Sequence, residues 1–120
     1  MTDSPPIVGA ALANRVADRL LSGRKLCFSH PEYCGIGLEY VAGTFVCAEV
    51  QDGEIASQGE YLRNKEHGEE MEFRAFSNRA EFVGWLAEQS DGSLSGMHLR
   101  RTWLHNNQRL TLARLISFDA

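Results

Sequence analysis

The chain has 120 residues, which is enough for one compact domain and too short for two ordinary ones. Apolar residues make up 43% and charged residues 23% of the sequence. This composition excludes a disordered chain, a collagen-like repeat and a disulfide-rich scaffold, so we expect one globular domain over residues 1–120. The 12 basic and 16 acidic side chains give a formal charge of −4, which disfavours general affinity for nucleic acid.

The ends and the cysteines of the chain predict a cytoplasmic protein. The first residues carry an acid and no base, unlike a secretion signal. No window approaches the roughly 20 apolar residues that cross a bilayer, so we expect no membrane segment. Three cysteines form an odd set without an export signal, which indicates reduced thiols.

The first predicted element is an amphipathic helix over residues 5–22. Ser4 followed by Pro5 and Pro6 is typical of a helix start, and Gly23 is placed to end the helix in a left-handed conformation. Between them, apolar residues recur at three- and four-residue spacing, as they do on the buried side of a helix.

Strands are predicted next. Residues 25–29 form a short apolar run, and residues 36–41 and 44–50 are β-rich runs separated by Ala42-Gly43. Asp52-Gly53 then closes the last run against residues 54–57. This order predicts a β-meander.

A two-residue turn at Ala42-Gly43 fixes which residues share a face of that meander. Strand pairing from this turn places one apolar set together and leaves Glu39 on the opposite face. The predicted apolar set is Ile36, Leu38, Tyr40, Phe45 and Cys47.

A further strand is predicted at residues 71–76, and a second helix follows it. Ser77 or Asn78 is the expected cap of this helix, and Asn78 has Glu81 three residues later in a capping-box pattern. We expect Ser90-Asp91-Gly92 to stop the helix. Its apolar stripe contains Phe82, Val83, Leu86 and Ala87, with Trp85 at the margin.

The last segment allows two predictions. In one, residues 97–104 and 109–118 are strands joined by a turn at Asn106-Asn107. In the other, Thr111 caps a short terminal helix, and Leu112, Leu115 and Ile116 face inward. Periodicity over so few residues does not choose between them.

Together these elements predict the α+β class. We expect a two-layer sandwich with a mostly antiparallel sheet of four to six strands, and two main helices packed on one face.

Charge is segregated along the chain. Residues 26–62 contain no lysine or arginine, whereas residues 92–118 contain four arginines and no acid. The acidic side chains of the first block, here called the meander acids, are Glu32, Glu39, Glu49, Asp52, Glu54 and Glu60. The arginines of the second are Arg100, Arg101, Arg109 and Arg114.

Three interpretations of this segregation are open. The two blocks can neutralise each other through exposed pairs worth about 0–1 kcal/mol each. Alternatively, the meander acids steer a basic protein partner, which predicts a small non-enzymatic binding module of the immunity, chaperone or regulator type. Nucleic-acid binding by the tail through Trp103 is disfavoured by the acidic total. A homodimer through strand edges or the helix layer is compatible with each.

No motif assigns a catalytic residue, a metal site or a cofactor, and whether the protein is an enzyme stays open. Cys27, His30, Cys34 and Cys47 are zinc-binding residue types, but their spacing is not that of a zinc site, and Cys27 and Cys47 fall in predicted strands. The alternative function is a small enzyme or ligand-binding protein with a thiol or ligand pocket at His30, Tyr33 and Cys34.

Overall fold

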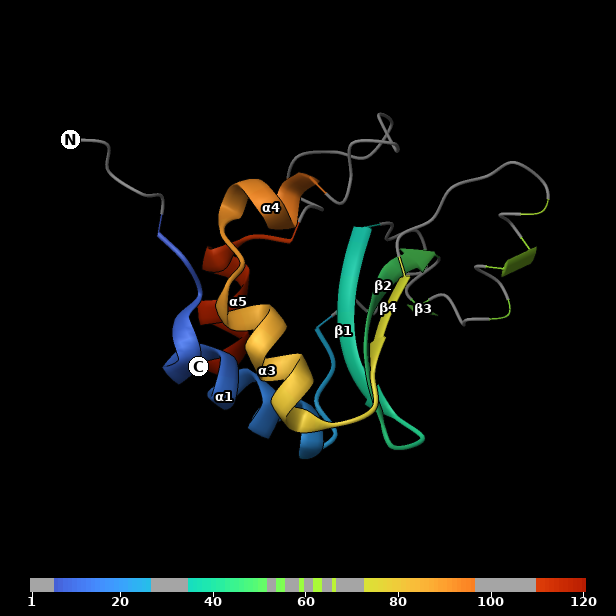
Figure 1. Ribbon diagram of the computed structural model, residues 1–120, viewed down its shortest axis with the longest axis horizontal. Coiled ribbons are helices and arrows are strands. Elements are labelled where there is room, and N and C mark those ends of the chain that lie inside the picture. Colours follow the sequence, from blue (N-terminus) through green and yellow to red (C-terminus); the bar gives the residue numbers. More distant parts are fainter. Residues whose placement is uncertain are drawn as a thin grey trace.

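The computed structural model describes residues 6–26, 35–51, 54, 55, 59, 62, 63, 66, 73–96 and 110–120, with the backbone alone at 35, 49–51, 54, 55, 95 and 96. The helices are α1 (Gly9–Leu21), α3 (Arg79–Ala87), α4 (Asp91–Gly96) and α5 (Leu112–Asp119). The strands are β1 (Gly35–Val41), β2 (Thr44–Gln51), β3 (Glu54–Ile55) and β4 (Phe73–Phe76). These elements confirm the α+β class (Figure 1). No helix in the described ranges is long and apolar enough to span a bilayer.

Strand β2 is the centre of the antiparallel sheet. It pairs with β1 on one side, and with β4 and the short β3 on the other. The helices gather on one side of this sheet in Figure 1. The finer expectation of a two-layer sandwich with four to six strands stays a prediction.

The β1–β2 turn has the geometry that its sequence predicts. Ala42 and Gly43 both have positive φ, at 52° and 78°, as a two-residue type I′ turn requires. Tyr40 therefore pairs with Phe45, and Leu38 with Cys47, while Glu39 pairs with Val46 in the alternate register. The predicted division of residues between the two faces is confirmed.

Helix α1 ends as predicted but begins later. At its end Gly23 has φ 98°, and the N–H groups of Gly23 and Arg24 donate to the carbonyls of Leu20 and Arg19, which closes a left-handed cap. The expected start at residue 5 is wrong. Ile7 instead forms an antiparallel bridge with Ser90, and the Val8 N–H donates to the Gln89 carbonyl at 2.8 Å. Ile7 and Val8, which the local pattern assigns to the helix, therefore pair with a distant segment instead.

Of the two caps expected for α3, the structure has Asn78, whose Oδ1 accepts from the Glu81 N–H at 2.9 Å. The role predicted for Ser90-Asp91-Gly92 is incomplete, since α3 ends at Ala87 and this segment starts α4. Ser90 Oγ accepts from the Ser93 N–H, and Ser93 Oγ accepts from the Ser90 N–H. This reciprocal pair caps the start of a new helix.

The terminal segment is helical, which decides between the two predictions for residues 110–118. Thr111 Oγ1 accepts from the Arg114 N–H at 3.2 Å, so the predicted cap is confirmed. Leu115 and Phe118 are the buried residues of α5, whereas Ile116 is exposed, contrary to expectation. The proposed strand and turn at residues 97–107 lie outside the described residues.

The predicted strand at residues 25–29 is described only at its start. Leu26 forms an isolated antiparallel bridge with Leu38, with two backbone hydrogen bonds of 2.9 and 3.0 Å. This bridge fixes the chain that follows α1 against the outer edge of β1.

A row of aromatic rings joins the sheet to α3. Phe82 of α3 stacks on Phe45 of β2, with ring centres 4.7 Å apart, and lies edge-on to Phe76 of β4 at 5.8 Å. Trp85 packs against Phe76 at 5.2 Å. Cys47 is buried beside this row, as predicted for a small apolar residue. The core therefore lies between the sheet and the helices.

Candidate functional site

The structure describes only some of the site residues that the sequence predicts. Glu49 lies opposite Ile36 in the β1–β2 register, and Glu54 lies opposite Gln51. Glu39 pairs with Val46, whereas Glu49 pairs with Ile36. These two register positions belong to opposite faces of the sheet. The other predicted positions lie outside the described residues; they are Glu32, Asp52, Glu60, His30, Tyr33 and Cys34.

Glu39 is the meander acid whose side chain is described, and its charge is compensated within the chain. Its carboxylate lies 3.1 Å from Lys25 Nζ, and only 16% of the side chain is exposed. The Leu26–Leu38 bridge holds Lys25 beside Glu39, because each residue precedes or follows a bridge partner. The neutralisation interpretation named the tail arginines, but for Glu39 the partner is a lysine that precedes the acidic block.

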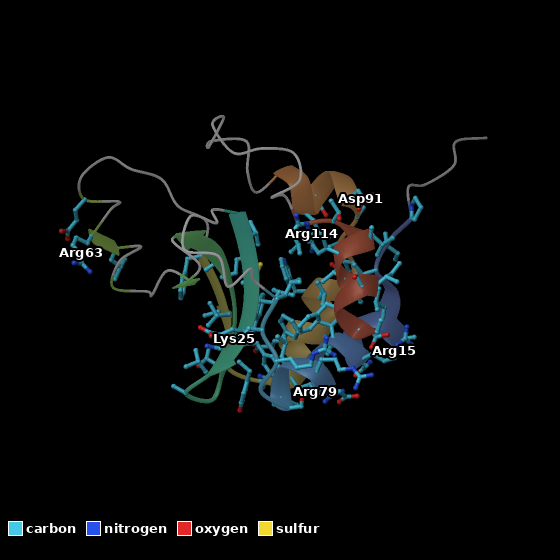
Figure 2. All side chains as sticks on the ribbon, turned by 180° about the vertical axis from the view of Figure 1, so that it is seen from behind. Arg15, Lys25, Arg63, Arg79, Asp91 and Arg114 are labelled. Atoms are coloured by element: carbon cyan, nitrogen blue, oxygen red, sulfur yellow. The ribbon has the colours of Figure 1, made fainter. Side chains whose placement is uncertain are left out.

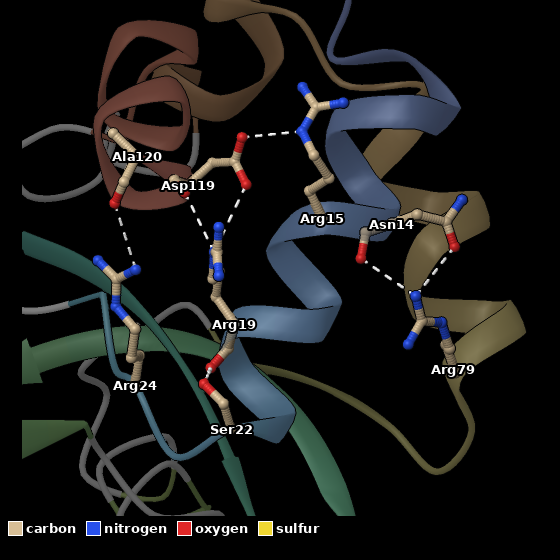
Figure 3. A network of polar contacts seen from close by, with 8 residues as sticks. All are labelled: Asn14, Arg15, Arg19, Ser22, Arg24, Arg79, Asp119 and Ala120. Carbon is tan, nitrogen blue, oxygen red and sulfur yellow. Dashed lines mark hydrogen bonds and ion pairs between the residues drawn. The ribbon is translucent and has the colours of Figure 1, made fainter.

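Sequence reasoning missed the polar surface of α1, which Figure 3 shows from close by. Along one flank of α1, Arg79 reaches across from the first turn of α3. Its Nη1 lies 2.7 Å from Asp18 Oδ1, and its Nη2 donates to the carbonyl and Oδ1 of Asn14. These contacts tie α3 to α1.

The other flank of α1 and the turn that follows it meet the end of α5 through three arginines, here called the arginine corner: Arg15, Arg19 and Arg24. Arg15 Nε donates to Asp119 Oδ2 at 2.8 Å. Arg19 Nε donates to the Asp119 carbonyl at 3.1 Å and lies 3.7 Å from Oδ1, which accepts no hydrogen bond. Arg24 Nη1 donates to the Ala120 carbonyl at 3.4 Å, and its guanidinium lies 5.1 Å from the centre of the Phe118 ring.

The arginine corner carries more positive than negative side-chain charge. The C-terminal end of α5 carries the negative pole of the helix dipole, which favours cations there. The Asp119 carboxylate is 17% exposed and faces two guanidinium groups, those of Arg15 and Arg19. Chemically, the corner offers N–H donors and positive charge, which suits it to binding anions.

The sequence contains the residues of this corner, but no local pattern links them. Arg15 and Arg19 are four residues apart on the polar side of the predicted helix, and Asp119 is the one acid that follows Asp91. Their contact spans about a hundred residues of sequence, so local patterns do not connect them.

Metal binding and known relatives give no further assignment. Within the ranges that the structure describes, no three His, Cys, Asp or Glu side chains are grouped to hold a metal ion. No protein-family model matches the chain, and no curated protein or solved structure is significantly similar to it.

Proposed function

We propose that the protein is a non-enzymatic binding module of the cytoplasm whose meander acids engage a basic protein partner. The observation that carries this proposal is the charge pattern of residues 26–62, where six carboxylates occur without a lysine or arginine. Concentrated charge of one sign accelerates encounter with an oppositely charged protein and selects against partners of the same sign.

One feature of the sheet supports this proposal, and another limits it. Three of the meander acids lie in paired strands of the sheet, and strand pairing holds their backbones in position. They are Glu39 of β1, Glu49 of β2 and Glu54 of β3. Glu39 is already paired with Lys25, which reduces what it can contribute to a partner. Binding energy therefore comes from the other five meander acids, and a small acidic module of the immunity, chaperone or regulator type fits a basic protein partner.

The first experiment measures association with immobilised poly-L-lysine at low and high salt. The variant E54Q/E60Q removes two meander charges, and E81Q/E88Q removes two charges from exposed positions of α3 and its end. Because both variants have the same net charge, a local acidic surface predicts slower association for E54Q/E60Q alone. Equal rates for the two variants would reject the meander as the binding surface.

A second experiment identifies the partner by cross-linking in native lysate with the same variants. We expect a basic protein that wild type, E39Q and E81Q/E88Q capture and that E54Q/E60Q loses. Capture of a second copy of this chain would indicate the homodimer instead. Capture that no meander substitution affects would contradict the proposal.

A further inference from the structure

The arginines of the corner use only part of their hydrogen-bonding capacity. Arg15 and Arg19 each donate through Nε, and their Nη groups make no hydrogen bond to any described residue. The two side chains are 53% and 47% exposed, so these donors reach solvent. A guanidinium held at Nε still offers the edge formed by its two Nη groups to an oxyanion.

The same contacts hold the two guanidinium groups in place before any ligand arrives. Arg15 and Arg19 lie one turn apart on α1, where side chains four residues apart are about 5–6 Å from each other at Cβ. Asp119 contacts both, through different oxygens. Restricting the two side chains in the free protein lowers the entropy that binding would otherwise cost.

The negative pole at the end of α5 explains why Arg15 and Arg19 donate through Nε there. The positive charge of the arginines still exceeds the negative charge of Asp119. Arg15 and Arg19 carry two charges against one on Asp119, a surplus of 2 − 1 = +1. Arg24 faces the Ala120 oxygen and the Phe118 ring instead. A phosphate monoester near neutral pH carries about −1.5 to −2 charges, so the surplus attracts it.

We infer that Arg15 and Arg19, positioned by Asp119, form a binding site for a phosphate group, either inorganic phosphate or a phosphate monoester. The site lies on the helix side of the molecule, where Figure 2 labels Arg15, and Arg63 lies at the opposite end of the view. It does not depend on the meander acids, so it can be tested apart from the proposed function.

The test is a calorimetric titration with inorganic phosphate and with O-phosphoserine, and sodium acetate at equal ionic strength is the comparison. R15Q and R19Q should each weaken phosphate binding about tenfold, since each removes a charged bidentate donor. R63Q removes an equal charge from an exposed position outside the corner and should bind as wild type does. A tighter complex with O-phosphoserine than with phosphate assigns the site to a monoester, and the reverse assigns it to the free ion.

R15K and R19K separate a shaped site from a positively charged surface. Lysine keeps the charge but lacks the planar fork, so binding should still weaken in both variants. Lysine also preserves an ion pair with Asp119, which protects the fold if a glutamine variant fails to fold. Unchanged affinity in R15K and R19K, or equal binding of acetate, would overturn the inference.

Discussion

At the residue scale, Ala42 occupies a position for which its side chain is poorly suited. It is the non-glycine residue with positive φ among those described, at 52°. A Cβ in the left-handed region costs free energy, which glycine avoids and which asparagine offsets by local hydrogen bonding of its side chain. Alanine at the first position of the type I′ turn therefore lowers the stability of the protein.

Replacing Ala42 with asparagine should stabilise the protein by about 0.5–1 kcal/mol, because Asn-Gly is the preferred pair in a type I′ turn. The urea midpoint of unfolding measures this gain. The matched control is A113N, at an exposed position inside α5, where the same substitution lowers helix propensity and should destabilise. A loss of stability in A42N would contradict the turn assignment.

At the element scale, α5 is held mainly by apolar contacts. Leu115 and Phe118 are buried in the core, whereas Arg15, which binds Asp119, is half exposed. An ion pair that reaches solvent contributes at most about 1 kcal/mol, and a buried leucine contributes several times more. The arginine corner therefore contributes less to the docking of α5 than its apolar side does.

Two variants compare these contributions. Leu115→Ala should cost about 2–5 kcal/mol in the free energy of unfolding, and Asp119→Asn about 1 kcal/mol or less. Chemical denaturation followed by circular dichroism measures both. A larger loss for Asp119→Asn than for Leu115→Ala would show that the ion pairs dominate.

The start of α5 depends on an acid from another helix. Asp91 Oδ1 accepts from the Leu112 N–H at 2.7 Å, while Thr111 caps the Arg114 N–H. Asp91→Ala should destabilise the protein by about 1 kcal/mol and speed hydrogen exchange at the Leu112 amide. Asp91→Asn keeps an acceptor oxygen and should retain most of the protection. Equal exchange in both variants would reject this cap.

Helix ends were predictable where the capping chemistry is local. Gly23 and Asn78 make their contacts within a few residues, and their roles follow from sequence order alone. The start of α1 was not predictable in this way, because the partner of Ile7 is Ser90. The Ser-Asp-Gly segment that the sequence assigns to the end of α3 instead begins α4, because α3 already ends at Ala87.

At the scale of the whole molecule, Phe82 connects the two sides of the core. Its ring contacts Phe45 and Phe76 in the sheet and lies 6.4 Å from Trp85 on its own helix. Its packing therefore stabilises the contact between α3 and the sheet, two elements that are not joined by backbone hydrogen bonds.

Phe82→Ala should therefore destabilise the protein by about 3–5 kcal/mol, a large part of the 5–15 kcal/mol typical of a domain. Tyr40→Ala is the comparison, since its ring is partly exposed and packs on Phe45, and about 1 kcal/mol is expected. Thermal unfolding measures both, and Trp85 fluorescence in a W103F background reports the change near the ring. Similar losses in the two variants would contradict the central position of Phe82.

The α+β class and the face of the meander were predictable because both follow from periodicity and turn chemistry. The arginine corner was not, since three arginines near the beginning of the chain meet the end of α5 only after the helices pack. Charge counting found the acidic block in the sequence, but it could not show that Lys25 compensates Glu39.

The contact between α1 and α5 also constrains how the molecule forms during synthesis. Arg15 and Asp119 are separated by 104 positions, so α1 leaves the ribosome long before its partner helix exists. Until then the nascent chain exposes the side of α1 that Leu115 and Phe118 will cover. Completion of the core therefore waits for α5 to emerge, and a chaperone has that interval in which to act.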